Sequence, residues 1–223
     1  MNKRSLTVVV SRASALILSI PKSFILCLYI FGFKKGIKLP MIFHYRTKVR
    51  VSRGHIKCTK KRILFGFGGT DGISRKVQSY FIVEKGFLIF KGDAKFGEGS
   101  SIRVSNGKVI IGDGLLSNKN LLLYVEEYLE IGEKAVIGWN TDIRDGDGHQ
   151  IAGNQMNIPI HIGDNCWIGS DVLILKGVKL GENCIIGAKS VVTKAISKSF
   201  IPASSTIVGM PAKVIKTGIE WTN

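Results

Sequence analysis

The chain has few of the residues that metal sites, disulfide frameworks and covalent catalysis require. Its four histidines are His44 and His55 in the N-terminal part and His149 and His161 far behind them. This spread disfavours a zinc site made of three histidines. The four cysteines have no paired spacing, which points to a reducing compartment. No Gly-x-Ser-x-Gly motif or plausible cysteine–histidine pair is present, so an acyl-enzyme has no evident nucleophile.

Acidic residues are absent from the first 70 positions, which hold 15 lysines and arginines. The remainder of the chain has 17 basic and 16 acidic residues, so the net charge of +16 lies almost entirely in the N-terminal part. A basic surface can attract nucleic acid or an anionic membrane. Because no aromatic ladder or known nucleic-acid-binding motif accompanies it, we expect no nucleic-acid partner.

The N-terminal part also lacks an uninterrupted apolar run long enough to cross a bilayer. Residues 13–20 and 24–33 are apolar, but Pro21, Lys22 and Ser23 separate them, and a span needs about 20 apolar residues. A secretory signal is disfavoured because no small-residue cleavage site follows Phe33. We expect residues 1–65 to form a small, partly helical appendage that either caps the main domain or lies on a membrane surface.

A six-residue repeat runs from residue 162 to residue 197. The units open with an aliphatic residue, and four of them continue with glycine: Ile162-Gly163, Ile168-Gly169, Ile174, Leu180-Gly181, Ile186-Gly187 and Val192. A period of six fits neither the 3.6 of a helix nor the 2 of a single strand. If each unit forms one flat side, three units make one turn of a triangular coil. The sequence therefore predicts an all-β, parallel β-helix that starts near residue 80, within a domain over residues 66–223 that ends in a short tail.

The corners and interior of such a coil make separate demands on the sequence. We expect glycine and asparagine to occupy the corners with positive φ, and Asn165 and Asn183 are separated by three hexapeptide units, as stacked corners require. Cys166 and Cys184 then point inward as small core residues. The period is broken twice, since the intervals from Ile111 to Ile131 and from Ile143 to Ile162 both exceed three hexapeptide units. Each irregularity predicts an excursion where a site can be assembled.

His149 lies at the start of the second excursion, in the sequence DGDGH at 145–149. An imidazole on such a loop can act as a general base if a carboxylate or carbonyl holds its tautomer. Asp145 and Asp147 are candidates for that orienting role, although acidic residues between glycines often serve the turn itself.

The hexapeptide units, DGDGH, PIHIGDNCWIGS at 159–170 and IVGMPAKVI at 207–215 together resemble the hexapeptide-repeat acyltransferases. The likeness is greatest to bacterial O-acetyltransferases of surface polysaccharides, with galactoside, maltose and virginiamycin-type acetyltransferases as broader kin. It is strong over 129–215, fair from 80, and gives no information on function before that. The resemblance implies a left-handed β-helix, a homotrimer, acetyl-CoA as co-substrate in the groove between two subunits, no metal, and His149 as general base.

The resemblance also assigns binding roles. It places Asn118 and Glu127 at the acceptor, although the family usually has aspartate where this chain has Glu127. It places Trp167, Ser170, Ala188, Thr193 and Lys194 along the pantetheine and nucleotide, and Lys213 and Lys216 near the CoA phosphates. The alternatives are that Asn118 and Glu127 are solvated loop residues, that the two lysines only add charge, and that Trp167 packs against a neighbouring subunit.

The sequence and the resemblance together predict an acetyl-CoA-dependent acetyltransferase that acts directly on a sugar hydroxyl of a cell-surface polysaccharide or its precursor. Transfer to an amino sugar or small xenobiotic is the alternative on the same scaffold, because a fold does not select its acceptor. A non-enzymatic binding solenoid is the alternative of another class. We expect a cytoplasmic protein, at the inner face of the membrane if residues 1–65 contact it.

Overall fold

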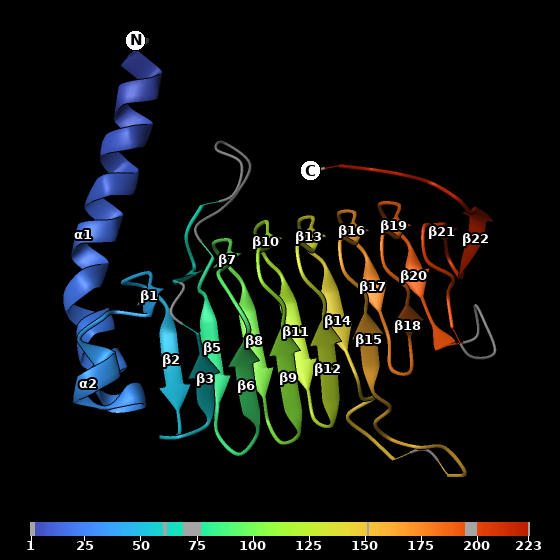
Figure 1. Cartoon of the computed structure of the whole chain (residues 1–223), viewed down its shortest axis with the longest axis horizontal. Coiled ribbons are helices and arrows are strands. Elements are labelled where there is room, and N and C mark those ends of the chain that lie inside the picture. Colours follow the sequence, from blue (N-terminus) through green and yellow to red (C-terminus); the bar gives the residue numbers. More distant parts are fainter. Residues whose placement is uncertain (1–2, 60–61, 69–76, 151, 195–199, 223) are drawn as a thin grey trace.

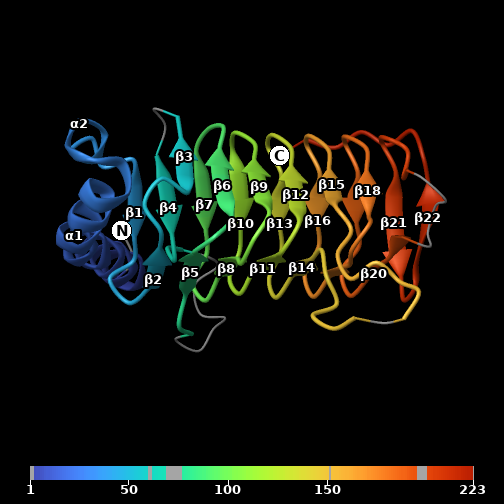
Figure 2. The ribbon, with the colours of Figure 1, turned by 90° about the horizontal axis from the view of Figure 1, so that it is seen from below.

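The computed structural model describes residues 3–59, 62–68, 77–150, 152–194 and 200–222. Two helices, α1 (Lys3–Phe31) and α2 (Phe33–Gly36), precede a long coil of short strands (Figure 1). The strands form three sheets that run the length of the coil. Figure 2 shows the coil from below, with α1 and α2 across its N-terminal end.

From β1 to β18, each turn of the coil contributes one strand to each sheet, in the order A, B, C. Sheet A contains β1 (Met41–Phe43), β4 (Ile63–Phe65), β7 (Ala94–Phe96), β10 (Leu115–Ser117), β13 (Val136–Ile137), β16 (Trp167–Ile168), β19 (Ile185–Ile186), β21 (Thr206–Gly209) and β22 (Ala212–Lys216). Sheet B contains β2 (Lys48–Val51), β5 (Tyr80–Val83), β8 (Ser101–Val104), β11 (Leu122–Val125), β14 (Asp142–Arg144), β17 (Leu173–Ile174) and β20 (Val191–Val192). Sheet C contains β3 (Ile56–Cys58), β6 (Phe87–Phe90), β9 (Lys108–Ile111), β12 (Tyr128–Ile131), β15 (Ile160–Ile162) and β18 (Lys179–Leu180). We call the three edges the AB, BC and CA corners.

The chain forms the predicted left-handed parallel β-helix, and the strand register shows how its turns stack. Neighbouring strands pair in parallel, except that β22 pairs antiparallel with β21 at the C-terminal end. On sheet A the buried Ile137, Ile168, Ile186 and Ile207 stand in one column, each aligned with the next. The opening residue of the hexapeptide is thus the inward residue, and each buried side chain contributes about 1.5–3 kcal/mol to folding.

Phenylalanines and small thiols fill different parts of the core. In the first coils the rings of Phe43 and Phe65 each lie about 5 Å from the ring of Phe81. Further along the coil, Cys166 and Cys184 are buried and form no disulfide, as predicted for small core residues. The hydrogen bond with Cys184, together with burial, raises the pKa of the Cys166 thiol, which suits a packing role rather than a nucleophilic one.

The coil begins earlier than its sequence period indicates. The predicted boundary at residue 66 and the predicted start near residue 80 are both wrong, because β1 to β4 already form coil strands between Met41 and Phe65. Met41 aligns with Ile63, and Ile63 with Ala94, so these two turns differ in length and both exceed three hexapeptide units. Loops of unequal length hide the period there, whereas the aligned Trp167 and Ile185 are separated by three units.

The N-terminal helix is continuous through Pro21, although the sequence suggested two runs separated there. Proline removes one helical hydrogen bond, but tertiary contacts hold the helix on both sides of it. The Ser19 and Ser23 hydroxyls accept hydrogen bonds from the backbone N–H groups of Tyr45 (2.8 Å) and Phe43 (2.9 Å). Its segment Ala13–Phe31 is long and apolar enough, by length and composition, to cross a membrane.

At the corners, asparagine and glycine have different roles, although the sequence analysis expected both to adopt positive φ. Asn165 and Asn183 have positive φ, as predicted, and their side chains are hydrogen-bonded at 2.9 Å. The glycines in the second place of the repeat do not have positive φ. They are required by space, because a Cβ on Gly163 would lie 2.5 Å from the backbone N of Glu182 on the next turn.

We therefore expect Gly163→Ala to lower the free energy of unfolding by about 3 kcal/mol, because two stacked backbones must separate. Thermal unfolding should show a fall in Tm of roughly 10 °C. Gly54→Ala is the matched control, since Gly54 has a φ of 87° but nothing within 4 Å of the added Cβ. Its positive φ alone should cost about 1 kcal/mol, and equal losses from the two variants would contradict the packing explanation.

Candidate active site

The excursion that carries His149 leaves the coil at the BC corner, between β14 and β15 (lower right of Figure 1). Its base is closed by a bridge between Gly146 and Asn157 and by the Ile158 N–H, which donates to the Asp145 carbonyl at 2.8 Å. The Lys176 ammonium, from the next turn, donates to the Asp147 carboxylate and to the Met156 carbonyl (3.2 Å). The base is therefore fixed to the coil, and His149 lies exposed beyond it.

Asp145 has a structural role that its sequence position did not reveal. Its carboxylate is buried and accepts hydrogen bonds from the backbone N–H groups of Glu126 (2.9 Å), Glu127 (2.7 Å) and Tyr128 (2.8 Å). It thereby ties its own turn of the coil to the preceding BC corner. Burial raises the pKa of the Asp145 carboxyl, against the effect of the three donors. The predicted orienting role of Asp145 is corrected accordingly, because both of its oxygens are engaged by that corner.

Asp147 and His149 are close in sequence but do not form a pair. The Asp147 carboxylate binds Lys176. Within the described part of the chain, the exposed His149 ring makes no hydrogen bond, so no described residue occupies either ring nitrogen.

The other late histidine, His161, is already engaged on the face of sheet C. Its Nδ1 lies 3.7 Å from the Glu130 carboxylate, which also accepts a hydrogen bond from the Tyr128 hydroxyl at 2.9 Å. Burial, together with that hydrogen bond, raises the pKa of Tyr128 to about 12. His149 is thus the more accessible of the two imidazoles.

The two residues predicted to bind the acceptor lie at different corners. Glu127 is exposed at the BC corner, one turn before His149, and its N–H is held by Asp145. The structure therefore brings Glu127 to the foot of the His149 excursion. Asn118 follows β10 at the AB corner, so sheet B separates it from His149 within one chain.

Ser170 and Ala188 occupy equivalent places on adjacent turns of the AB corner, as their spacing predicts. The Lys189 N–H donates to the Ser170 carbonyl at 2.9 Å, which joins the two turns. In the described chain, the N–H groups of Ser170 and Ala188 themselves have no hydrogen-bond partner. Two free donors therefore stand about 4.8 Å apart along this corner.

Sequence reasoning missed Trp139 and Lys176. Trp139 takes the place in its turn that Ser170 takes in the next, and its N–H donates to the Ser170 hydroxyl at 3.1 Å. Its indole Nε1 is buried without a partner among the described residues. Trp139 follows Gly138 as Ser170 follows Gly169, and this shared position in the repeat could have identified Trp139 from the sequence. Lys176 had none, because its partners lie about 20 residues or more away.

The remaining predicted residues are spread over the C-terminal turns. The Trp167 side chain is 46% exposed, and its ring lies 5.9 Å from that of Trp221 in the chain's own tail, a packing that neither sequence interpretation foresaw. Thr193 and Lys194 lie at the BC corner after β20, next to residues outside the described part of the chain. Lys213 and Lys216 are exposed on β22.

These positions form two groups on the same stretch of coil. His149, Glu127, Thr193 and Lys194 follow the BC corner, and Asn118, Trp139, Ser170 and Ala188 follow the AB corner. One chain alone does not bring the groups together, since the two corners border opposite edges of sheet B.

Comparison with known proteins identifies relatives over most of the chain. Residues 159–194 match the family described as "Bacterial transferase hexapeptide (six repeats)". WcaF of Escherichia coli strain K12, named as a colanic acid biosynthesis acetyltransferase, is 30% identical over 177 residues, which is 70% of this chain and 93% of WcaF. The galactoside O-acetyltransferase of the same strain is 35% identical over 112 residues. That match covers 48% of this chain and only 52% of the relative.

A solved structure titled as galactoside acetyltransferase in complex with coenzyme A is also similar. It is 30% identical, covers 49% of this chain and 55% of its own, and has a TM-score of 0.42.

Proposed function

The chain belongs to the hexapeptide-repeat acetyltransferases, and on this premise we propose that it acetylates a sugar hydroxyl of a cell-surface polysaccharide or its precursor, with acetyl-CoA as the donor. The observation that carries the proposal is the exposed His149, displayed on an excursion whose base is fixed to the coil and adjoins Glu127. The likeness to WcaF over nearly its full length supports a polysaccharide rather than a small acceptor.

His149 has the position and chemistry of a general base. Acetyl-CoA supplies an acetyl thioester when bound. His149 accepts the proton of the sugar hydroxyl as that oxygen bonds to the thioester carbon, and returns the proton to the departing sulfur when the carbon–sulfur bond breaks. Asn118 can donate a hydrogen bond to the oxyanion, and Glu127 can accept one from a neighbouring sugar hydroxyl. No covalent enzyme intermediate is needed.

The AB corner has hydrogen-bond donors that suit acetyl-CoA. The free N–H groups of Ser170 and Ala188 are spaced to meet the amide carbonyls of a pantetheine arm that lies along the coil. Lys213 and Lys216 can meet the CoA phosphates.

We propose that a homotrimer completes the site. Two coils side by side can place the AB corner of one copy beside the BC corner of the next, which unites the two groups that a single chain keeps apart. The groove between copies then holds the donor, with His149 at its edge.

The test is turnover of acetyl-CoA with a panel of oligosaccharides and amino sugars. CoA release and the mass of the product are measured. We expect one added acetyl group that mild alkali removes, because esters hydrolyse under conditions that leave amides intact. An alkali-resistant product would instead establish N-acetylation. CoA release that never depends on a sugar would contradict the polysaccharide assignment.

A further inference from the structure

The N-terminal helix α1 exposes an apolar side, whereas the side that faces the coil carries the polar Ser19 and Ser23 together with Cys27 and Ile30. Ser19 and Ser23 are buried against the first turn of the coil, and the Lys22 ammonium donates to the backbone carbonyls of Tyr45 (3.2 Å) and Thr47. The exposed apolar residues are Leu16, Ile17, Leu18, Ile20, Phe24, Ile25 and Tyr29. A surface helix that faces water has the reverse arrangement.

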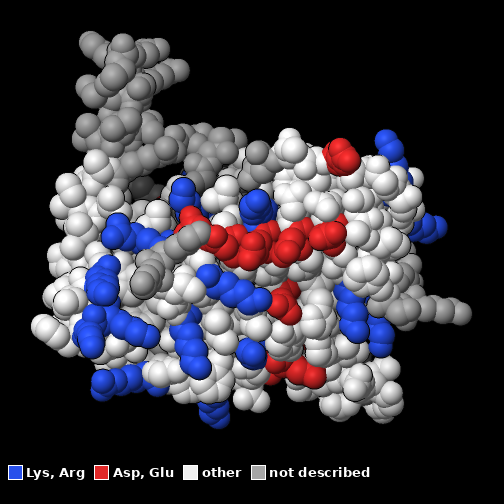
Figure 3. Space-filling model, in the orientation of Figure 1, with Lys and Arg blue, Asp and Glu red and all other residues white. Residues whose placement is uncertain are grey.

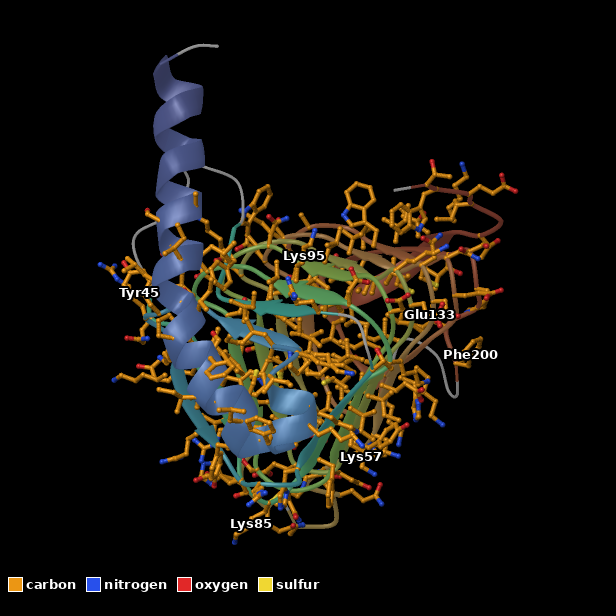
Figure 4. All side chains as sticks on the ribbon, turned by 60° about the vertical axis from the view of Figure 1, so that its left-hand side comes forward. Tyr45, Lys57, Lys85, Lys95, Glu133 and Phe200 are labelled. Carbon is orange, nitrogen blue, oxygen red and sulfur yellow. The ribbon has the colours of Figure 1, made fainter. Side chains whose placement is uncertain are left out.

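The helix α2 continues this apolar surface. It packs closely on α1, because a Cβ on Gly36 would lie 2.7 Å from the Cys27 carbonyl oxygen. Phe33 and Ile37 are exposed beside it, Phe33 at 77%. Figure 4 shows α1 and α2 together across the end of the coil. We call Ile17, Leu18, Phe24, Ile25, Tyr29, Phe33 and Ile37 the apolar end surface; a patch of this kind marks an interaction site.

Basic residues surround the apolar end surface. The exposed ones between the start of α2 and the end of β3 are Lys34, Lys35, Lys38, Arg46, Lys48, Arg50, Arg53 and Lys57. Arg50 pairs with Glu84 at 2.8 Å, and the first 70 positions of the sequence contain no acidic residue. Figure 3 shows Lys and Arg gathered over this end of the molecule and Asp and Glu further along the coil. The charge therefore selects an anionic partner.

A hollow at the edge of the apolar end surface combines both features. It lies between α1 and β2 and has a volume of about 600 Å³. Ile25 and Leu26 form its apolar wall, and Arg46 and Lys48 form its basic rim. An anionic headgroup with an attached hydrocarbon chain has matching chemistry.

We propose that the apolar end surface docks onto a membrane rich in anionic lipid, with α1 lying in the plane of the interface. The apolar side chains enter the headgroup and acyl boundary, while the surrounding lysines and arginines meet lipid phosphates. The length of Ala13–Phe31 would also allow a transmembrane span. The in-plane placement is favoured because a span would strip Ser19, Lys22 and Ser23 of their partners on the coil.

The test is flotation of the full chain with vesicles of phosphatidylcholine, with and without phosphatidylglycerol. We expect binding to the anionic vesicles that weakens with salt. Ile17→Glu/Ile25→Glu changes two residues that are 65% and 68% exposed, and should lower the bound fraction by at least about tenfold. Ile215→Glu is the matched control, because Ile215 is 62% exposed at the opposite end of the coil and should leave binding unchanged.

A second pair of variants tests the charge. Lys34→Glu/Lys35→Glu should weaken binding to anionic vesicles by about tenfold or more. Lys85→Glu/Lys108→Glu makes the same change in net charge on the second and third turns of the coil, and should weaken binding much less. Three results would overturn the proposal. The first is equal flotation of Ile17→Glu/Ile25→Glu and its control Ile215→Glu. The second is a change in oligomeric state on Ile17→Glu/Ile25→Glu without vesicle binding by the wild type, which assigns the surface to a second copy. The third is binding that only detergent reverses, which indicates a span.

Discussion

Replacing His149 with alanine should lower the kcat/KM of acetyl transfer by about 10²- to 10⁴-fold, the contribution typical of a positioned general base. A sugar hydroxyl is a weak nucleophile, and its proton has to leave as the new bond forms. His149→Ala removes the acceptor for that proton. Its exposed side chain makes no hydrogen bond to the described residues, so thermal unfolding should be unchanged. The measurement is initial CoA release with the preferred sugar, corrected for thioester hydrolysis.

His55→Ala is the control for loss of an imidazole as such. His55 is stacked on Phe87 in the early turns of the coil, with a ring separation of 5.0 Å, far along the sequence from the excursion. Its variant should keep wild-type turnover. If His149→Ala also turned over at the wild-type rate, the base would have to be sought elsewhere, with His161 the next imidazole to replace.

Replacing Asp145 with alanine should instead destabilise the whole coil. Three backbone N–H groups lose their buried carboxylate acceptor, at a cost of about 3–5 kcal/mol in the free energy of unfolding. For a chain of this size the Tm should fall by roughly 10 °C or more. Thermal unfolding followed by circular dichroism measures the change.

Asp147→Ala is the matched control from the same excursion. Among the described residues, its partly exposed carboxylate meets only Lys176, which keeps its bonds to backbone carbonyls, so we expect a loss of less than about 1 kcal/mol. Equal losses from the two variants would refute the anchoring role of Asp145. Full stability of Asp145→Ala with a selective loss of turnover would restore the orienting role that its position near His149 first suggested.

The coil was predictable because the six-residue period of the sequence places equivalent residues directly above one another on successive turns. Ile168 and Ile186 open successive units in the sequence and lie side by side in sheet A. Where the loops between strands vary in length, as between Phe65 and Ala94, stacking persists but the period does not. Residues 41–65 therefore gave no sign of belonging to the coil.

The site was predictable only in part, for a related reason. His149 stands out because it interrupts the repeat. Asp145 binds backbone N–H groups. Because almost every residue type has one, the sequence does not show which positions are its partners. The separation of Asn118 from His149 depends on which corner each residue reaches, and that depends on the turns counted from the start of the coil. The contact between Trp167 and Trp221 joins the coil to a tail outside the repeat.

The stacking of turns also makes the coil a rigid spacer. His149 leaves the coil after β14, four strands beyond β2 in sheet B, and strands stack at about 4.8 Å, so about 19 Å of coil separates its level from the helical end. If that end rests on lipid, catalysis takes place at a constant height above the bilayer. A lipid-tethered acceptor must then be long enough to bridge this height, so the number of stacked turns sets the shortest glycan that can be modified.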